Sequence, residues 1–266
     1  MSKFTDRQYL KTDQYRDSSN LDARAAIHMR FSTNPYGWFH WFFDHLLKLP
    51  EGAKILELGC GPAYLWKECS SRIRAGWKIT LSDLSSGMLD ATWRNLVVTG
   101  RAFKFEEIDA QSIPYQDETF DAVIANYMLY HVPHRPKAIA EIKRVLKPGG
   151  YLFAATVGEN HLMKIIEWTR HATNGKQADT FAQSFTLENG LKQLTPLFPN
   201  TRLLRYSDSL RVTEVEPMMA YIRSSIRASE LSEEKLEQIR ADLKNELVIK
   251  GEILITKDSG LFEAVK

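Results

Sequence analysis

The segment Glu57-Leu58-Gly59-Cys60-Gly61-Pro62-Ala63 constrains the fold of this chain more than any other. It follows a run typical of a strand, Lys54 to Leu58, and precedes a run typical of a helix, Ala63 to Arg74. Glycines between a strand and a helix let the backbone approach a ligand closely at the carboxyl edge of a sheet. A second predicted strand, Lys78 to Leu81, is followed closely by Asp83. These features predict an α/β fold with a ligand site at the strand ends.

Strand and helix patterns alternate from residue 53 to residue 157. Five strands are predicted, at 54–58, 78–81, 103–108, 120–125 and 151–156. Pro136 is typical of the first turn of a helix, and Pro148-Gly149-Gly150 is expected to end that helix. Strands separated by helices of 10 to 15 residues indicate a mostly parallel sheet with helices on both faces.

The flanking regions are predicted to be largely helical. Residues 1–50 read as an N-terminal helical extension, and 51–266 as the main domain with a helical insert at about 158–200. Two further strands are expected, at 201–206 and in the tail after residue 251. The continuity of the chain favours one domain over two independent folds.

Composition excludes several classes of protein. The 266 residues carry 35 Lys and Arg against 33 Asp and Glu, a net charge of +2, so no nucleic-acid partner is expected. The most aromatic stretch, Trp38 to Leu49, is too short and too polar to insert in a membrane. Two cysteines and a polar N-terminus predict a cytoplasmic protein. No cluster has the spacing of metal ligands, so no metal is expected.

The glycine loop allows two kinds of cofactor to be compared. The dinucleotide fingerprint needs a small residue at its sixth position, where this chain has Tyr64. A diphosphate also favours a bare helix N-terminus, whereas Glu57 suits a cationic ligand better. Both observations argue against a nicotinamide dinucleotide.

The segment ILELGCGPA resembles the first motif of class I S-adenosylmethionine-dependent methyltransferases. Further segments resemble the same family in order and spacing, over residues 50–157, and the nearest subgroup is the quinone-biosynthesis C-methyltransferases. The resemblance implies a Rossmann-like, seven-stranded, mostly parallel sheet whose antiparallel seventh strand lies at 252–264. It also implies S-adenosyl-L-methionine as the cofactor and S-adenosyl-L-homocysteine as the product.

The resemblance assigns cofactor contacts residue by residue. Asp83 is expected to bind both ribose hydroxyls, Met88 to pack on the adenine, and Asn126 to contact the methionine end. The full set of expected contacts in the main domain is Glu57, Gly59, Cys60, Gly61, Asp83, Leu84, Met88, Asp109, Ala110, Gln111 and Asn126. Ala63 departs from the family by replacing the third glycine, which is tolerable if its φ is negative and costs affinity if its φ is positive.

The remaining candidates leave alternatives open. His131 is the best candidate for a general base, and the alternative is a structural role. By analogy with related enzymes, residues 1–50 form a lid in which Tyr15 covers the methionine moiety and Arg30 or Arg24 reaches its carboxylate. A solvated helix is the alternative for this extension. In the insert, Trp168, Phe181 and Phe185 form either a substrate cover or ordinary core packing.

We therefore expect an S-adenosylmethionine-dependent methyltransferase acting on a small organic acceptor. The alternatives are an RNA or protein methyltransferase, or a regulator that binds the cofactor without catalysis. The methyl-accepting atom and the oligomeric state are not readable from the sequence.

Overall fold

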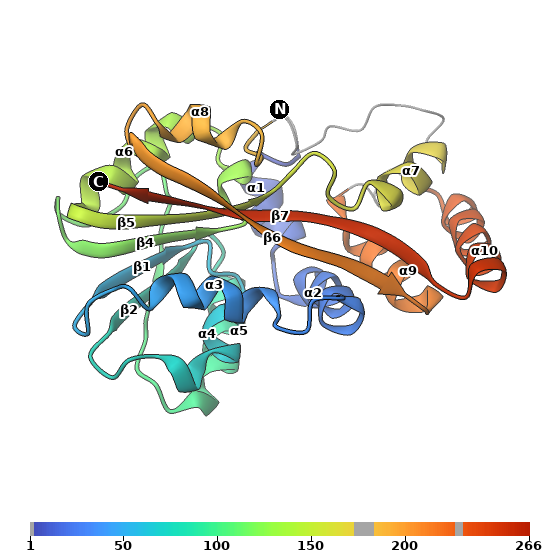
Figure 1. The fold of residues 1–266 in the computed structure, drawn as a ribbon, viewed down its shortest axis with the longest axis horizontal. Coiled ribbons are helices and arrows are strands. Elements are labelled where there is room, and N and C mark those ends of the chain that lie inside the picture. Colours follow the sequence, from blue (N-terminus) through green and yellow to red (C-terminus); the bar gives the residue numbers. More distant parts are fainter. Residues whose placement is uncertain (1–2, 173–183, 227–230) are drawn as a thin grey trace.

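The computed structural model describes residues 3–172, 184–226 and 231–266. These residues form a seven-stranded sheet in the order β3-β2-β1-β4-β5-β7-β6 (Figure 1). Its strands are β1 (Lys54–Leu58), β2 (Lys78–Asp83), β3 (Lys104–Glu107), β4 (Phe120–Asn126), β5 (Leu146–Val157), β6 (Asn200–Val212) and β7 (Ile253–Val265). The first five strands are parallel, and β7 runs antiparallel to both of its neighbours. The predicted Rossmann-like sheet and its antiparallel seventh strand are confirmed.

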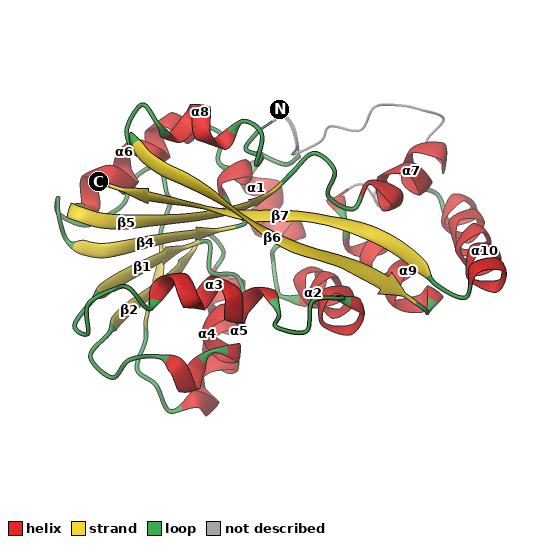
Figure 2. Ribbon diagram, in the orientation of Figure 1, coloured by secondary structure: helices red, strands yellow, loops and turns green. Residues whose placement is uncertain are grey.

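Helices cover both faces of the sheet (Figure 2). The α-helices in the described residues are α1 (Arg7–Tyr9), α2 (Ser19–Phe31), α3 (Trp38–Leu46), α4 (Tyr64–Glu68), α5 (Ser86–Leu96), α6 (Arg135–Val145), α7 (Met163–Ala172), α8 (Gly190–Leu194), α9 (Val215–Ser224) and α10 (Glu233–Lys250). On one face α3 buries Phe42 and Phe43 beside Trp66 of α4. On the other face α6 buries Ile139 and Ile142, whose spacing places them on one side of the helix.

The boundary between α6 and β5 differs from the sequence prediction. Helix α6 ends at Val145, and β5 begins at Leu146 rather than at residue 151. The Pro148-Gly149-Gly150 turn therefore lies inside the strand, where the pairing of β4 with β5 shifts between Phe120 and Ala122. Gly149 has a φ of +74°, which a residue with a side chain rarely adopts.

Strands β6 and β7 project beyond the rest of the sheet as a two-stranded ribbon. They pair along their whole length, from Asn200↔Val265 to Val212↔Ile253. The pairing of β5 with β7 extends only to Val157↔Ser259. The part of the ribbon formed by residues 207–212 and 253–258 therefore has no third strand beside β7. Helices cover this part of the ribbon instead (Figure 1).

Four helices and this ribbon form a structure that we call the cap. Helices α2, α7, α9 and α10 share one hydrophobic core with it, which includes Ile27, Ile165, Leu210, Met219 and Leu243. Of the predicted insert at 158–200, only α7 belongs to the cap. Helices α9 and α10 of the cap come from the segment between β6 and β7. A pattern confined to one stretch of sequence does not reveal that separate stretches share a core.

The aromatic residues of the insert have different surroundings. Trp168 is buried in the core of the cap. Phe185 is completely buried in the core beneath α6 and packs against Phe262 at a ring-centroid distance of 5.6 Å. Phe181 lies outside the described residues. Of the two interpretations, core packing holds for Trp168 and Phe185.

Candidate active site

A cavity of about 450 Å³ opens at the carboxyl ends of β1, β2 and β4. The N-terminal segment and the cap enclose its other sides. Nearly all of the predicted site residues line it: Tyr15, Glu57, Gly59, Cys60, Gly61, Asp83, Leu84, Met88, Asp109, Ala110, Gln111, Asn126 and His131. Arg30 is the one predicted site residue that the structure does not bring there.

The backbone of the glycine loop is left-handed at both of its glycines. Gly59 and Gly61 have φ values of +65° and +53°. A Cβ on Gly59 would lie 2.8 Å from Cβ of Met128, so a side chain there would force the two loops apart. Ala63 is also left-handed, with a φ of +57°, which costs an L-residue about 1–2 kcal/mol. Ala63 therefore has the positive φ with which it is expected to lower the affinity for the cofactor.

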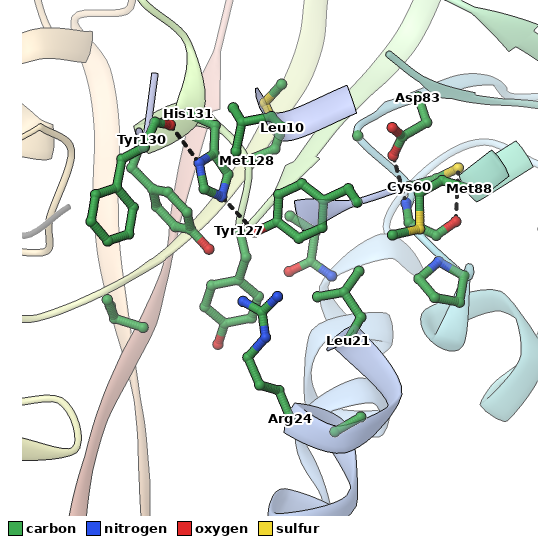
Figure 3. A pocket seen from close by; sticks show the side chains of 18 of the residues that line it. Leu10, Leu21, Arg24, Cys60, Asp83, Met88, Tyr127, Met128, Tyr130 and His131 are labelled. Carbon is green, nitrogen blue, oxygen red and sulfur yellow. Dashed lines mark hydrogen bonds between the residues drawn. The ribbon is translucent and has the colours of Figure 1, made fainter. Parts of the chain in front are cut away.

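The carboxylate of Asp83 connects β2 to the glycine loop. It accepts hydrogen bonds from the backbone N–H of Gly61 at 3.0 Å and of Ser85 at 2.9 Å. Burial raises its pKa, and these backbone donors oppose that rise by stabilising the charged form. Asp83 therefore holds the loop in shape and faces the cavity with its remaining lone pairs (Figure 3).

Glu57 differs from the ionised group expected at this position. Its carboxyl group is buried and accepts a hydrogen bond from Nε1–H of Trp66. Burial raises the pKa of Glu57 to about 8. The hydrogen bond from the indole N–H lowers the pKa, but by less than burial raises it. The group is therefore largely protonated at neutral pH until a cation approaches it.

The expected cofactor contacts at the end of β3 are connected to the N-terminal segment. Asp109 accepts hydrogen bonds at 3.0 Å from the backbone N–H and from the side chain of Gln111. It also forms an ion pair of 3.0 Å with Arg7. One turn further along, Lys11 pairs with Glu107 at the end of β3. Two ion pairs thus hold the N-terminal segment across the strand ends.

Two polar atoms beside the cavity, away from Asp109, are buried and lack partners among the described residues. They are Oδ1 of Asn126, at the end of β4, and Nη2 of Arg24, on α2. In Figure 3 the guanidinium of Arg24 points from α2 into the space beside Tyr127 and His131. A buried polar atom without a partner costs free energy, and a ligand can recover that cost. An amide oxygen and a guanidinium fit an α-amino group and an α-carboxylate, which are the two ends of a methionine moiety.

Arg30 is turned away from the cavity although it lies on the same helix as Arg24. It binds both carboxylate oxygens of Glu214, at 2.6 and 2.7 Å, in a partly exposed ion pair. Of the two arginines considered for the carboxylate of the cofactor, the structure supports Arg24 alone.

His131 is engaged at both of its ring nitrogens. Nδ1–H donates to the carbonyl oxygen of Phe4 at 2.8 Å, so Nε2 is the atom that accepts from the hydroxyl of Tyr15, also at 2.8 Å. Burial lowers the pKa of His131 to about 4. With both nitrogens occupied by the N-terminal segment, the geometry favours the structural interpretation of this residue over the general base.

We call residues 4–16 the N-terminal strap. Besides its ion pairs and the contacts to His131, its backbone packs closely on the start of α5. Ser85 Oγ donates to the carbonyl of Tyr15 at 2.8 Å. A Cβ on Gly87 would lie 1.9 Å from the carbonyl oxygen of Arg16, so this glycine is needed for the close approach. The strap contacts at Arg7, Lys11 and Ser85 carry no recognisable sequence signal.

The cavity extends past Asn126 into the cap. We call this part the distal chamber. Its polar lining includes His28 of α2, His161 just before α7, Tyr221 of α9 and Lys257 of β7. His161, Tyr221 and Lys257 lie outside the segments with recognisable motifs, and no spacing links them. Among the described residues, no group of three or more His, Cys, Asp or Glu could hold a metal ion. No helix in those same ranges has the length and apolar character needed to cross a membrane.

Residues 56–154 match the family model described as a methyltransferase domain. Combined with the sheet order and the position of the cavity, this match defines a class I S-adenosylmethionine-dependent methyltransferase domain. The cofactor of this class is S-adenosyl-L-methionine, and the unpartnered atoms of Asn126 and Arg24 fit its methionine end.

Within that class the chain is similar to the ubiquinone/menaquinone biosynthesis C-methyltransferase UbiE of Chromobacterium violaceum. The two are 33% identical over 102 residues, which are 38% of this chain and 42% of that enzyme. The chain thus matches less than half the length of this curated relative.

Solved structures with the same fold cover more of the chain. A putative methyltransferase from Bacillus halodurans has a TM-score of 0.59 at 16% identity, over 86% of this chain and 98% of that one. A phosphoethanolamine N-methyltransferase from Haemonchus contortus, solved with phosphomonomethylethanolamine and S-adenosylhomocysteine, has a TM-score of 0.60 at 18% identity. It covers the whole of this chain and 60% of that one. At these identities the likeness concerns the fold alone.

Proposed function

We propose that this protein transfers a methyl group from S-adenosyl-L-methionine to a small organic acceptor. The observation that carries the proposal is a single cavity that runs from the glycine loop and Asp83, past Asn126, into the distal chamber. One part of this cavity has the residues expected around the cofactor, and the distal chamber extends beyond them. A protein that only stored the cofactor would not need this second space.

When bound, the cofactor supplies an electrophilic methyl group on a positively charged sulfur. The residues of this chain then have three tasks. Asp83 and the glycine loop orient the nucleoside end, Asn126 and Arg24 hold the amino and carboxyl groups, and the strap excludes water. Tyr15 fits the proposed lid, because its hydroxyl is bound to His131 and the guanidinium of Arg24 lies 5.5 Å from its ring centroid.

The shape of the distal chamber also indicates what kind of acceptor the protein takes. The cap and the strap surround the distal chamber, and the described lining of that chamber is a mixture of apolar and polar side chains. A concave space with this lining suits a small molecule better than a folded RNA or protein. The net charge of +2 agrees, since it provides no basic surface for RNA.

Two measurements test the proposal. Isothermal titration with S-adenosylmethionine and S-adenosylhomocysteine should show one site per chain. Incubation with methyl-labelled cofactor and a cell extract, fractionated into small molecules, RNA and protein, should then place the label among the small molecules. Label in RNA or protein would assign another class of acceptor. Cofactor binding with no transferred label, in extracts that support a known methyltransferase, would favour the non-catalytic regulator.

A further inference from the structure

Glu57 lies on the same face of the sheet as Asp83 and Asn126, the residues expected to hold the two ends of the cofactor. It is in register with Leu81 of β2 and with Ile124 of β4. Asp83 and Asn126 come two residues further along those strands. Residues two apart in a strand point to the same face, as do residues in register on neighbouring strands. The side chains of Glu57, Asp83 and Asn126 therefore share one face at the carboxyl edge, and all three line the cavity.

Glu57 and Asp83 are two buried carboxyl groups in one site, and their hydrogen bonds are unequal. Asp83 accepts from the backbone N–H groups of Gly61 and Ser85. Glu57 is 2% exposed, and its carboxyl group has one partner among the described residues, the indole N–H of Trp66. Neighbouring carboxylates repel each other, and the one with more hydrogen-bond donors retains its charge more readily. The geometry therefore leaves the proton on Glu57.

No cation in the described part of the chain offsets this arrangement. The Arg and Lys side chains that line the cavity there are Arg7, Lys11, Arg24 and Lys257. None of them is among the groups that shift the pKa of Glu57. Burial, and to a smaller extent the charge of Asp83, raises that pKa to about 8. Burial also raises the pKa of the thiol of Cys60, the other titratable group that interacts with Glu57, so that this thiol stays protonated.

The charge state of Glu57 is expected to change when a cation is held beside Asn126. Oδ1 of Asn126 is buried without a partner among the described residues, and it fits the α-ammonium group of the cofactor. A positive charge next to a carboxyl group favours the ionised form. Because salt screens buried charges much less than exposed ones, one ammonium group can take the place of the proton on Glu57.

We propose that Glu57 makes cofactor binding a proton-releasing reaction, because its neutral carboxyl group ionises when the amino-acid end of the cofactor is held at Asn126. In this step the O–H bond of Glu57 breaks, the electron pair stays on the oxygen, and the proton passes to the solvent. The resulting carboxylate is stabilised by the ammonium group. This inference rests on the contact proposed for Asn126, and it does not depend on the transfer of a methyl group.

The affinity for the cofactor should therefore depend on pH. Below about pH 8 the free protein carries the proton that binding has to displace, so the affinity falls as the pH falls. Above about pH 8 no proton has to be displaced, and the affinity is constant. From pH 8.5 to pH 6.5 we expect the Kd for S-adenosylhomocysteine to rise by up to about 20-fold. This window lies above the pH range in which His131 is expected to release the strap.

Isothermal titration counts the protons directly. S-adenosylhomocysteine, whose amino group is protonated at neutral pH, is titrated into the full chain at pH 7 in PIPES and in imidazole, two buffers with different enthalpies of protonation. The difference in heat should correspond to about 0.9 proton released per chain, because a group with a pKa of about 8 is protonated to that extent at pH 7. Adenosine, which lacks the amino-acid end, should bind without releasing a proton. The infrared C=O band of a protonated carboxyl group should disappear with S-adenosylhomocysteine and remain with adenosine.

A variant identifies the group that loses the proton. In Glu57→Gln the amide oxygen can still accept the hydrogen bond from Trp66, but the side chain has no proton to release. Proton release and the pH dependence of the Kd should both disappear. The matched control is Glu263→Gln, which should release the proton as wild type does. Glu263 is also buried, but it is paired with Lys48 and Arg202 and does not line the cavity.

The inference is overturned if wild type binds S-adenosylhomocysteine without releasing a proton, if adenosine releases as many protons, or if Glu57→Gln releases the same number as wild type. These results leave the proposed function intact, because it depends on cofactor binding and label transfer. Absence of any binding heat in wild type would overturn the proposed function together with the inference. If Glu57→Gln does not fold, the comparison of the two probes on wild type and the infrared band decide the inference.

Discussion

The hydroxyl of Tyr15 donates a hydrogen bond of 2.8 Å to Nε2 of His131, and this contact joins the N-terminal strap to the loop after β4. The two residues are 116 positions apart in the sequence. The other ring nitrogen of His131 binds the carbonyl of Phe4, so one imidazole holds two points of the strap. His131, the candidate general base, and Tyr15, the candidate lid residue, therefore belong to one closure over the cavity.

Replacement of Tyr15 should weaken this closure. Tyr15→Phe leaves Nε2 of His131 buried and unpaired, at a cost of about 1–3 kcal/mol to the closed strap. We expect the Kd for S-adenosylmethionine to rise about tenfold, as measured by isothermal titration. Tyr151→Phe is the matched control, since Tyr151 lies on β5 and does not line the cavity. Equal affinity in Tyr15→Phe and wild type would show that the strap does not cover the cofactor.

Acid should release the strap. Burial lowers the pKa of His131 to about 4, against about 6.5 for an exposed histidine. Above pH 6.5 the ring is neutral whether the strap is closed or open, and the closed form has its full stability. Between pH 6.5 and 4 only the open form takes up a proton, so the closed form loses stability as the pH falls, by at most about 3 kcal/mol.

Hydrogen exchange can follow this release locally. Amides of residues 4–16 should exchange faster as the pH falls from 6.5 to 4, after correction for the intrinsic pH dependence of exchange. In His131→Phe the corrected rates should lose most of this dependence. His28 and His161 also have lowered pKa values, so amides of the core strand β4 serve as the reference for global unfolding. Protection that stays constant down to pH 4 in the wild type would contradict this prediction.

The two arginines of α2 provide a matched pair. Arg24→Met removes a cation whose Nη2 is buried beside the cavity without a partner, whereas Arg30→Met removes an exposed ion pair with Glu214. We expect the Kd for S-adenosylmethionine to rise at least about tenfold in Arg24→Met, because a charged hydrogen bond contributes about 1.5–3 kcal/mol. Arg30→Met should bind like wild type. A larger effect at Arg30 would refute the assignment of the carboxylate contact.

Asp83 has a structural role besides the binding role that we propose for it. Asp83→Asn places an amide N–H₂ against one of the backbone donors of Gly61 and Ser85, so we expect a loss of about 1–3 kcal/mol in the free energy of unfolding. The Kd for the cofactor should rise at least about tenfold, through the loss of the proposed ribose contact and the distortion of the loop. Chemical denaturation and isothermal titration measure the two effects. Asp90→Asn, on the exposed side of α5, is the control and should change neither.

Local signals are sufficient for the parallel core of the fold. The strand at 54–58 was predicted with its observed ends, and Gly59 and Gly61 have the positive φ angles that their place between strand and helix requires. Hydrophobic periodicity and glycine conformation act within a few residues, so they can be recognised without tertiary contacts. The positions of Asp83 and Asn126 follow, because parallel strands end at one edge.

The remaining features depend on packing between distant segments. Ala63 adopts its left-handed backbone because the glycine loop and α4 are joined there, and its residue type gives no sign of this. Arg24 and Arg30 look equivalent in the sequence, and only the rotation of α2 against the other elements of the cap directs Arg24 to the cavity and Arg30 to Glu214. His28, His161 and Lys257 become neighbours because the β6–β7 ribbon projects beyond the sheet and gathers α2, α7 and α9 around it.

The sequence by itself therefore determined the parallel part of the sheet and the glycine loop, which depend on periodicity and backbone conformation over short stretches. The residues expected around the cofactor came from the family resemblance of residues 50–157. Only the tertiary structure decided that Tyr15 and His131 form a closure, that Arg24 rather than Arg30 faces the cavity, and that His28, His161 and Lys257 share the distal chamber. Each of these depends on which buried polar groups find partners across the fold, and that pairing is a property of the packed chain as a whole.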